Sequence, residues 1–258
     1  MRMLQLLGTA AKAVFACFTF AVGATGALAQ AGASQAEFQP KTVLELFTSQ
    51  GCSSCPAADA LLKSYIQRPD VIALSLAVDY WDYLGWKDTL ADPAFAKRQK
   101  YYSKMRGDGR IYTPQIVVNG LAHANGAHAA EIDHAIAKTS GKLAGERVAV
   151  KLSTGDGKLT IETGAIAEGD KPREGTIWLA VFQNEVQVPV RAGENKGQTL
   201  TYYNVVRDLK SVGNWTGKPA TIQLERAAVM RSGADGCAVL LQVGQTGPIL
   251  GAAVLPKW

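Results

Sequence analysis

The sequence lacks a hydrophobic run long enough to cross a membrane. The uncharged stretch from Ala13 to Ala29 has 17 residues and is rich in Ala and Gly, whereas a spanning helix needs about 20 strongly apolar residues. Basic residues precede the stretch and Ala27-Leu28-Ala29 closes it, which is the pattern of a secretory signal. We predict a signal peptide over residues 1–29 and a periplasmic or secreted mature protein that has no membrane association after cleavage. A membrane anchor is the weaker alternative.

The sequence also has little excess charge of one sign and few cysteines. The chain has 27 Lys and Arg against 22 Asp and Glu, a formal net charge of +5, without a basic stripe. We therefore expect no nucleic-acid partner. After signal cleavage the cysteines are Cys52, Cys55 and Cys237, and an odd number cannot form a fully paired disulfide framework. At least one thiol is left over or shared.

Apolar residues, in contrast, are abundant. They make up 47% of the sequence, and charged residues only 19%. This composition predicts one or two globular domains with a large core. The small residues of positions 30–40 indicate a linker that leads from the signal peptide into the first domain.

Residues 41–142 alternate between apolar runs and helical patterns. Near-continuous apolar runs that alternate with helices are typical of strands buried on both faces of a partly parallel sheet. We therefore predict an α/β domain here. Strands are expected at 43–47, 71–78 and 116–118, helices at about 53–67, 92–106 and 127–138, and a hairpin turn at Asn119-Gly120.

Residues 143–258 change to an alternating pattern. The segments 148–152 and 158–162 flank turn residues at 154–157 and predict a hairpin. This half is predicted to be a mostly antiparallel, β-sandwich-like domain. Its further strands are expected at 177–182, 186–190, 199–206, 220–224, 238–243 and 250–255.

The most specific motif is Gly51-Cys52-Ser53-Ser54-Cys55-Pro56, at the point where a strand turns into a helix. Unsatisfied N–H groups and the helix dipole at such a position stabilise an anion, which lowers the pKa of a thiol at the helix start. Cys52 is therefore the predicted nucleophile. Cys55 lies about one turn further on, where it can resolve a mixed disulfide while shielded from outside thiols.

Two simpler interpretations of the cysteine pair remain open. One is half of a zinc site, but such sites need four ligands and neither a second cysteine pair nor a close histidine pair follows. The other is an inert structural disulfide. The position after a strand, within a strand and helix alternation, favours the redox interpretation.

Two acidic residues are candidates for proton transfer. Glu45 interrupts the apolar strand at 43–47, and a buried carboxylate there could relay a proton from Cys55. Glu45 could equally be a hydrogen-bonded strand residue. Asp79 ends the apolar run at 71–78, on the side of the sheet where ligand sites gather.

Other polar and aromatic residues have less specific interpretations. The segment 79–86 contains four aromatic residues, which could wall a groove beside the cysteines or cap the core. His123, His128 and His134 have no metal-ligand spacing, so we expect surface or structural roles. Cys237 opens an apolar strand and is predicted to be a buried, inert thiol.

The run from Val43 to Pro56, together with the segments 78–82 and 112–115, resembles an uncharacterised family of exported bacterial proteins in the thioredoxin-like superfamily. Segments 188–190, 203–207 and 247–251 are similar to that family too, so the resemblance covers nearly the whole mature chain. It implies a thioredoxin-like fold with Cys52 and Cys55 as the redox pair. It does not imply a substrate.

Thr113-Pro114 gains its significance from this resemblance. In thioredoxin-like folds a cis-proline at this place packs beside the redox cysteines, and the backbone of the preceding residue can pair with an extended substrate. We therefore predict a cis bond, the alternative being a trans proline entering an edge strand. Ser53-Ser54 stands where typical thioredoxins carry Gly-Pro, and no Trp precedes Cys52, so the redox potential is left open.

Taken together, the sequence predicts a periplasmic thiol–disulfide oxidoreductase. Cys52 and Cys55 exchange electrons, Thr113 and Pro114 shape the docking site, and no dissociable cofactor or metal is needed. The expected partner is a protein or small molecule that carries thiols or a disulfide. A copper(I) module that uses the two thiolates, with His123 as a further ligand, is one alternative. A non-catalytic thioredoxin-like binding protein is the other. The sequence does not indicate an oligomeric state.

Overall fold

The computed structural model describes residues 42–167, 173–230 and 233–257. The predicted signal peptide and linker lie outside these ranges. Among the described residues, no helix combines the length and the apolar character that crossing a bilayer requires.

The first half of the chain alternates strands and helices, as the sequence predicts. Its elements are β1 (Thr42–Thr48), α1 (Cys55–Ile66), β2 (Val71–Ala77), the short 3₁₀ helix η1 (Asp82–Leu84), α2 (Pro93–Arg106), β3 (Gln115–Val118), β4 (Ala122–Asn125) and α3 (Ala129–Leu143).

The second half consists mainly of strands. Its elements are β5 (Val150–Gly155), β6 (Lys158–Thr163), β7 (Gly175–Pro189), β8 (Thr199–Trp215), β9 (Ala220–Glu225), the one-turn helix α4 (Arg226–Val229), β10 (Gly236–Val243) and β11 (Ile249–Leu255). The two runs expected at 177–182 and 186–190 are parts of one long strand, β7.

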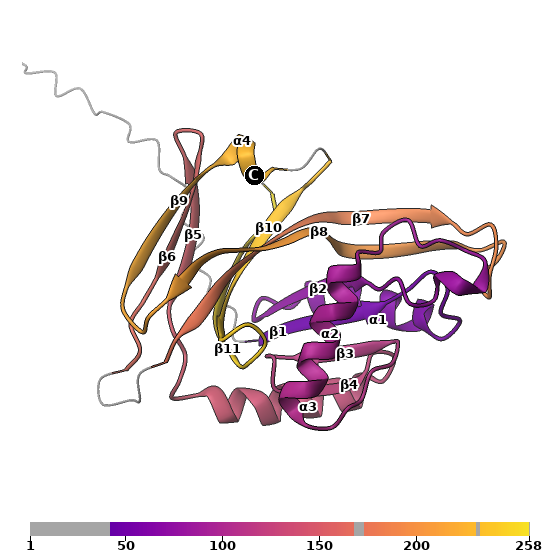
Figure 1. Cartoon of the computed structure of the whole chain (residues 1–258), viewed down its shortest axis with the longest axis horizontal. Coiled ribbons are helices and arrows are strands. Elements are labelled where there is room, and N and C mark those ends of the chain that lie inside the picture. Colours follow the sequence, from indigo (N-terminus) through magenta and orange to yellow (C-terminus); the bar gives the residue numbers. More distant parts are fainter. Residues whose placement is uncertain (1–41, 168–172, 231–232, 258) are drawn as a thin grey trace, which may run out of the picture. The chain divides into compact units, whose positions relative to one another are not determined.

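Eight strands form a mixed sheet in the order β11-β10-β7-β8-β2-β1-β3-β4, and three form a second sheet in the order β5-β6-β9 (Figure 1). β1 pairs with β2 in parallel and with β3 antiparallel, which confirms the predicted partly parallel sheet. Every residue of β1 and β2 is buried, as their near-continuous apolar sequences require. The protein therefore has a sheet-rich fold with a few helices.

The large sheet includes strands from both of the segments that the sequence separates at residue 142. The two groups meet where β2 pairs with β8 at Ser75 and Val205. One apolar cluster also combines them, since Leu74 of β2 packs in the same core as Phe182 of β7 and Leu240 of β10. The strands that flank the cysteine turn, β1 and β2, therefore share a sheet and a core with the C-terminal strands.

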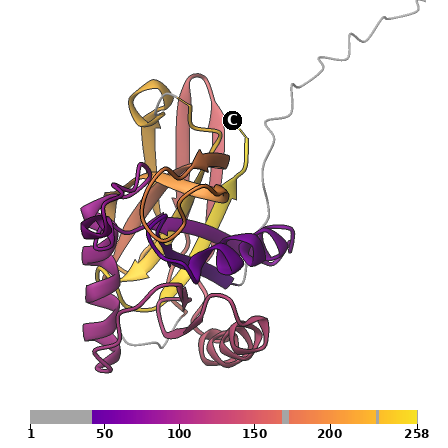
Figure 2. The ribbon, with the colours of Figure 1, turned by 90° about the vertical axis from the view of Figure 1, so that its right-hand side faces the viewer.

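Helices cover both faces of the β1 end of this sheet. Leu44 and Leu46 of β1 lie in one apolar cluster with α1 and α3, whereas Val43 and Phe47 lie in another with α2. This division follows from the alternation of side chains along a strand. Figure 2 shows α2 on the opposite side of the strands from α1 and α3.

The second sheet packs against the C-terminal strands of the first. Side chains of β5 and β6, such as Leu152 and Ile161, share an apolar cluster with Leu179 of β7 and Val239 of β10. Strands β5, β6 and β9 pair antiparallel, and so do β7, β8, β10 and β11 with their neighbours in this half. Antiparallel pairing and packing of two sheets are thus present, as predicted.

The hairpin between β3 and β4 turns at Asn119 and Gly120, as predicted. Both have positive φ, 51° and 68°, as the central residues of this tight turn, which the Leu121 N–H closes by donating to the Val118 carbonyl. Gly120 is also needed for space, because a Cβ atom there would lie 2.3 Å from the carbonyl oxygen of Gly247.

Candidate functional site

Cys52 and Cys55 are joined by a disulfide, with their Cα atoms 5.4 Å apart. Helix α1 begins at Cys55, two residues later than the sequence indicated, with Ser54 at its N-cap and Pro56 in its first turn. Cys52 therefore lies in the turn before the helix, and its carbonyl accepts a hydrogen bond from the Cys55 N–H at 3.2 Å. The Ser54 hydroxyl lies 3.5 Å from the Cys52 sulfur.

Both cysteines are shielded from solvent, although the two serines between them are exposed. Cys52 is 1% exposed and Cys55 is 0% exposed. The predicted shielding of Cys55 is confirmed, but Cys52 is covered as well. Access to Cys52 therefore depends on the segments that surround the turn.

Trp81 connects the cysteine turn to the Thr113-Pro114 segment. A Cβ atom on Gly51 would lie 2.9 Å from the Trp81 Cβ, so the tryptophan packs directly on the turn. The Trp81 indole N–H donates a hydrogen bond to the Thr113 hydroxyl at 2.8 Å. The bond between Thr113 and Pro114 is cis, as predicted. Of the aromatic residues at 79–86, Trp81 thus borders the cysteines.

Glu45 forms a buried ion pair that faces α2. Its side chain is 1% exposed, and its carboxylate accepts a hydrogen bond from the Arg98 guanidinium at 2.7 Å and another from the Tyr102 hydroxyl. Arg98 and Tyr102 both belong to α2, whereas Cys55 belongs to α1, which covers the other face of β1. The geometry favours the hydrogen-bonded strand residue over the proton relay predicted as its alternative.

Asp59 is a buried acid that the sequence reasoning did not identify. It follows Cys55 by one helical turn, so the two side chains share a face of α1. Asp59 is 3% exposed, and within the described ranges neither carboxylate oxygen has a hydrogen-bond partner of normal geometry. Burial raises the pKa of Asp59 well above its ordinary value, and the negative charge of Asp88 adds to this rise. The nearby Thr48 hydroxyl opposes it.

Two more buried polar groups lie around Asp59. The hydroxyls of Thr48 and Tyr202 are buried and make no hydrogen bond with any described residue. Burial and the charges of Asp59 and Asp88 raise the pKa of Tyr202. A polar cluster therefore lies within the apolar surroundings of the α1 face that carries Cys55. An Asp four residues after the second cysteine, on an otherwise apolar helix face, was the sequence signal for it.

Asp88 holds the cysteine turn from the loop after β2. Its carboxylate accepts hydrogen bonds from the backbone N–H groups of Gln50 at 2.7 Å and Leu90 at 2.8 Å. Burial raises its pKa, although these hydrogen bonds oppose the rise. Asp79, the other acid of this region, is half-buried at the end of β2.

The loop between β7 and β8, residues 190–198, lies on the cysteine turn. Asn195 is 1% exposed, and its side-chain amide donates hydrogen bonds to the carbonyls of Gln50 and Cys52, both at 2.9 Å. The Glu194 carboxylate accepts a hydrogen bond from the Ser53 N–H at 3.1 Å. These contacts join residues more than 140 positions apart, so sequence spacing could not have predicted them.

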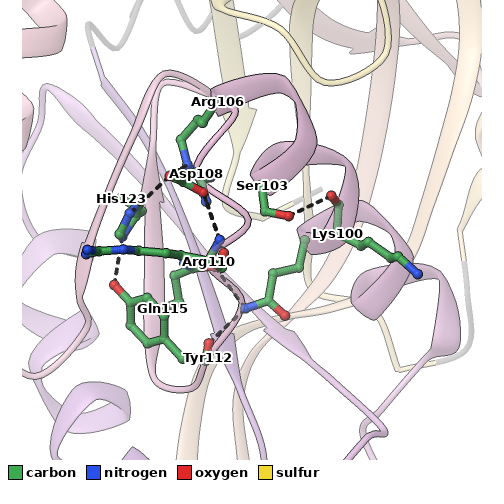
Figure 3. Close-up of polar contacts among 9 residues, drawn as sticks. Lys100, Ser103, Arg106, Asp108, Arg110, Tyr112, Gln115 and His123 are labelled. Atoms are coloured by element: carbon green, nitrogen blue, oxygen red, sulfur yellow. Dashed lines mark hydrogen bonds and ion pairs between the residues drawn. The ribbon is translucent and has the colours of Figure 1, made fainter.

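His123 supports the loop that leads to Pro114. Its Nδ1 lies 2.8 Å from the Tyr112 hydroxyl and its Nε2 lies 3.3 Å from Asp108, which also pairs with Arg106 (Figure 3). Burial and the positive charge of Arg106 lower the pKa of His123. Both ring nitrogens thus have protein neighbours, which fits the predicted structural role. His128 contacts Glu131 at the surface.

Cys237 is buried and unpaired, as predicted. It lies in β10 and packs in the apolar cluster between the two sheets. Burial raises the pKa of its thiol, which makes it a weak nucleophile. Among the described residues, no group of three or more His, Cys, Asp or Glu side chains could hold a metal ion.

Comparisons with known proteins identify relatives over most of the chain. Residues 43–242 match the family described as "Protein of unknown function (DUF1223)". The crystal structure of a protein from Agrobacterium tumefaciens, AGR_C_4864, is 37% identical, with a TM-score of 0.74 over 84% of this chain and 94% of that one. HBP35 of Porphyromonas gingivalis is 13% identical, with a TM-score of 0.59 over 85% and 76% of the two chains, a likeness of fold alone. No curated protein matches the chain.

Proposed function

Because the chain belongs to the DUF1223 family, whose description assigns no function, we propose from its own residues that it is a thiol–disulfide oxidoreductase working through Cys52 and Cys55. The observation that carries the proposal is the disulfide between these two cysteines at the start of a helix that follows a buried strand. A thiolate formed there is stabilised by the helix N-terminus. An inert crosslink over three residues would constrain little of the unfolded chain, because the stabilisation grows with loop length.

The reaction is a pair of thiol–disulfide exchanges. In the reduced protein the Cys52 thiolate attacks one sulfur of a substrate disulfide, and the substrate's other sulfur leaves as a thiolate that takes a proton. Cys55 then loses its proton and attacks the Cys52 sulfur. The second substrate thiolate leaves, and the Cys52–Cys55 disulfide forms with the two electrons transferred to the substrate. The reverse sequence oxidises a substrate dithiol.

Asp59 is the group best placed to take the Cys55 proton. A carboxyl with a raised pKa can exchange protons with a thiol near neutral pH. Asp59 lies one turn from Cys55, and its oxygens make no hydrogen bond of normal geometry with a described residue, although the Thr48 hydroxyl lies nearby. Glu45 is already held by Arg98 and Tyr102.

The proposal includes a thioredoxin-like organisation of residues 41–142 and export of the mature chain. The order β1-α1-β2 before the Thr113-Pro114 segment, followed by the β3–β4 hairpin and α3, supports the first point. The pattern of residues 1–29 supports the second. The substrate is then a thiol or disulfide of a protein or small molecule outside the cytoplasm.

Thiol labelling of the reduced protein tests the proposal. We expect Cys52 to react with iodoacetamide between about pH 6 and pH 8, because its thiolate is stabilised. Cys52→Ser should abolish turnover of a disulfide substrate, and Cys55→Ser should trap a mixed disulfide on Cys52. The matched control is Cys237→Ser, which should leave turnover unchanged.

Two results would count against the proposal. One is a reduced Cys52 that stays unreactive over this pH range. The other is stoichiometric copper(I) that is bound by the wild type and lost in Cys52→Ser, together with no turnover of any disulfide. That result would favour the metal-binding alternative.

A further inference from the structure

Residues 190–198 form a compact loop with its own hydrogen bonds. The N–H of Val190 donates to the carbonyl of Gln198, and the N–H of Gly197 donates to the carbonyl of Val190, both at 2.9 Å. Gly193 and Gly197 have positive φ, 76° and 86°, as tight turns require. The loop can therefore keep its shape whether or not it touches the cysteine turn.

Apolar side chains at the base of the loop fix it to the cysteine end of the sheet. Val188 and Val190 pack with Leu90 and Ala77 in a separate apolar cluster, and Trp86 packs against it. Figure 1 shows the long β7–β8 hairpin reaching the same end of the sheet as the loops after β1 and β2. The base of the loop is therefore held by apolar packing that does not depend on the contacts of the tip.

Polar contacts join the tip to the cysteine turn, while Gly193 lies against Trp86. Asn195 donates both of its amide hydrogen bonds to the turn, and Glu194 accepts one from Ser53. Cys52 is 1% exposed beneath this arrangement, whereas Ser53 and Ser54 are open to solvent. The hydrogen bond to the Cys52 carbonyl places the tip against the residue whose sulfur a bulky partner would have to reach.

Reduction changes the charge beneath the tip. An external dithiol gives two electrons to the Cys52–Cys55 bond and itself becomes a disulfide. Of its two protons, one ends on Cys55 and one in solvent, and Cys52 keeps a negative charge. That charge appears beside Ser53, whose N–H group is the donor to the Glu194 carboxylate. Two negative charges then compete for one helix N-terminus and repel each other.

We propose that Glu194 and Asn195 make residues 190–198 a selective cover, which closes over the oxidised cysteines and lifts when Cys52 becomes a thiolate. This inference rests on the proposed redox function and gives it a direction. The open, reduced protein meets disulfides in bulky polypeptides and reduces them, whereas the closed, oxidised protein accepts electrons only from a small or slender dithiol. Glu194 and Asn195 are thus specificity-determining residues.

The position of the cover is measured directly by NMR of the Asn195 side-chain amide. In the oxidised protein these two protons should exchange slowly with solvent, because both are donated to buried carbonyls. Chemical reduction should speed their exchange roughly tenfold or more. This measurement needs no substrate, so it remains valid if turnover of disulfides is never found.

Reagent size tests selectivity. For the oxidised protein, the rate of reduction by a reduced thioredoxin is divided by the rate with dithiothreitol. For the reduced protein, the rate of Cys52 alkylation by a polymer-linked maleimide is divided by the rate with the parent maleimide. Each ratio reports access and cancels changes in thiolate content.

The two variants should have opposite effects on access: one should increase it in the oxidised protein, and the other should decrease it in the reduced protein. Asn195→Ala should raise the ratio for the oxidised protein roughly tenfold or more, because two hydrogen bonds that close the cover are lost. Glu194→Gln should lower the ratio for the reduced protein, because the cover no longer meets a like charge. The matched control is Lys196→Gln, an exposed side chain of the same loop, which should change neither ratio.

Three outcomes would overturn the inference. The first is an Asn195 amide that stays protected after reduction. The second is an oxidised Asn195→Ala variant with the wild-type ratio and a native circular dichroism spectrum. The third is a reduced Glu194→Gln variant with the wild-type ratio. If the cover behaves as expected but no disulfide of a protein or a small molecule is ever turned over, the cover stands and the proposed function fails.

Discussion

Two buried carboxylates near the cysteines differ in what surrounds them. Glu45 has a guanidinium and a phenol as partners, so its charge is compensated. Asp59 has neither a cation nor a normal hydrogen bond among the described residues, so burial favours its protonated form. At the scale of single residues, these surroundings favour a structural role for the first and, under the proposed redox function, proton exchange for the second.

Asp59→Asn should change both stability and the release of substrate. A raised folded-state pKa means that the folded protein holds this proton more tightly than the unfolded chain, so wild-type stability falls as pH rises above the ordinary Asp pKa. The variant carries no titrating group at this position. Its free energy of unfolding, measured in urea, should therefore rise relative to that of the wild type between about pH 4 and about pH 8. Resolution of a trapped mixed disulfide should slow by about 10²-fold. An unchanged resolution rate would assign the proton to water or Asp79.

Glu45→Gln should destabilise the protein without slowing resolution. It leaves the Arg98 charge buried and unpaired, which typically costs about 3–5 kcal/mol. Denaturant unfolding measures the loss, and Asp70→Asn, which weakens a surface pair with Arg68, is the control and should cost less than about 1 kcal/mol. If Glu45→Gln instead slowed resolution and left the stability at the wild-type level, Glu45 would be the proton relay.

The sequence predicted the cysteine pair, the cis bond before Pro114 and the burial of Cys237, because each depends on local context. It gave two roles for Glu45 and could not choose, because the choice depends on Arg98, 53 positions away. Asp59 was overlooked because a single acid in a helix is ordinarily solvated. Only its burial between α1, β1 and β8 makes it unusual.

At the scale of elements, α1 and the strand after Pro114 approach each other through Gly126. A Cβ atom there would lie 2.7 Å from Leu46 Cδ1, 3.1 Å from the Ala58 Cβ and 3.2 Å from the Pro114 Cβ. The helix and the Pro114 segment can therefore be this close only because residue 126 has no side chain.

Gly126→Ala should cost about 1–3 kcal/mol through overpacking and should lower activity by moving α1 away from Pro114. Thermal unfolding and turnover measure the two effects. Gly141→Ala in α3 is the matched control, because a Cβ atom there meets nothing within 4 Å and alanine favours a helix by up to about 1 kcal/mol. Equal effects of the two changes would contradict this account.

The β7–β8 hairpin is an element whose full length and contacts the local sequence pattern did not predict. Its strands run over residues 175–189 and 199–215, whereas the expected runs end at 190 and 206. The unpredicted length is therefore mainly residues 207–215 of β8, which are mostly half-buried and pair with the start of β7, at the end of the hairpin away from the loop at 190–198. The contacts of the loop at 190–198 could not be inferred, because its partners Gln50, Cys52 and Ser53 lie in the turn between β1 and α1, more than 140 positions away.

At the scale of the whole molecule, the cysteine-bearing segment depends on the C-terminal strands for its core. Val43, Phe47 and Leu74 share their apolar cluster with Phe182 and with strands β10 and β11. A fragment that ends at residue 142 would expose this surface to water.

We expect residues 33–142 alone to be unfolded or aggregated, because the loss of these contacts exceeds a typical stability of about 5–15 kcal/mol. Circular dichroism and size-exclusion chromatography would show this, with residues 33–258 as the control. Cooperative thermal unfolding of the fragment would instead mean that it folds as an independent domain.

The burial of Cys237 makes its thiol a reporter of whether the protein is folded. Because its thiol is sealed between the two sheets, it meets an alkylating reagent only after global unfolding. Cys52, in contrast, should become reagent-sensitive on reduction, whereas Cys55 stays shielded in the folded protein. The labelled positions therefore distinguish four states: none when folded and oxidised, Cys52 when folded and reduced, Cys237 when unfolded and oxidised, and all three when unfolded and reduced. Mass spectrometry of the labelled peptides would thus report redox state and conformational integrity together, without a spectroscopic probe.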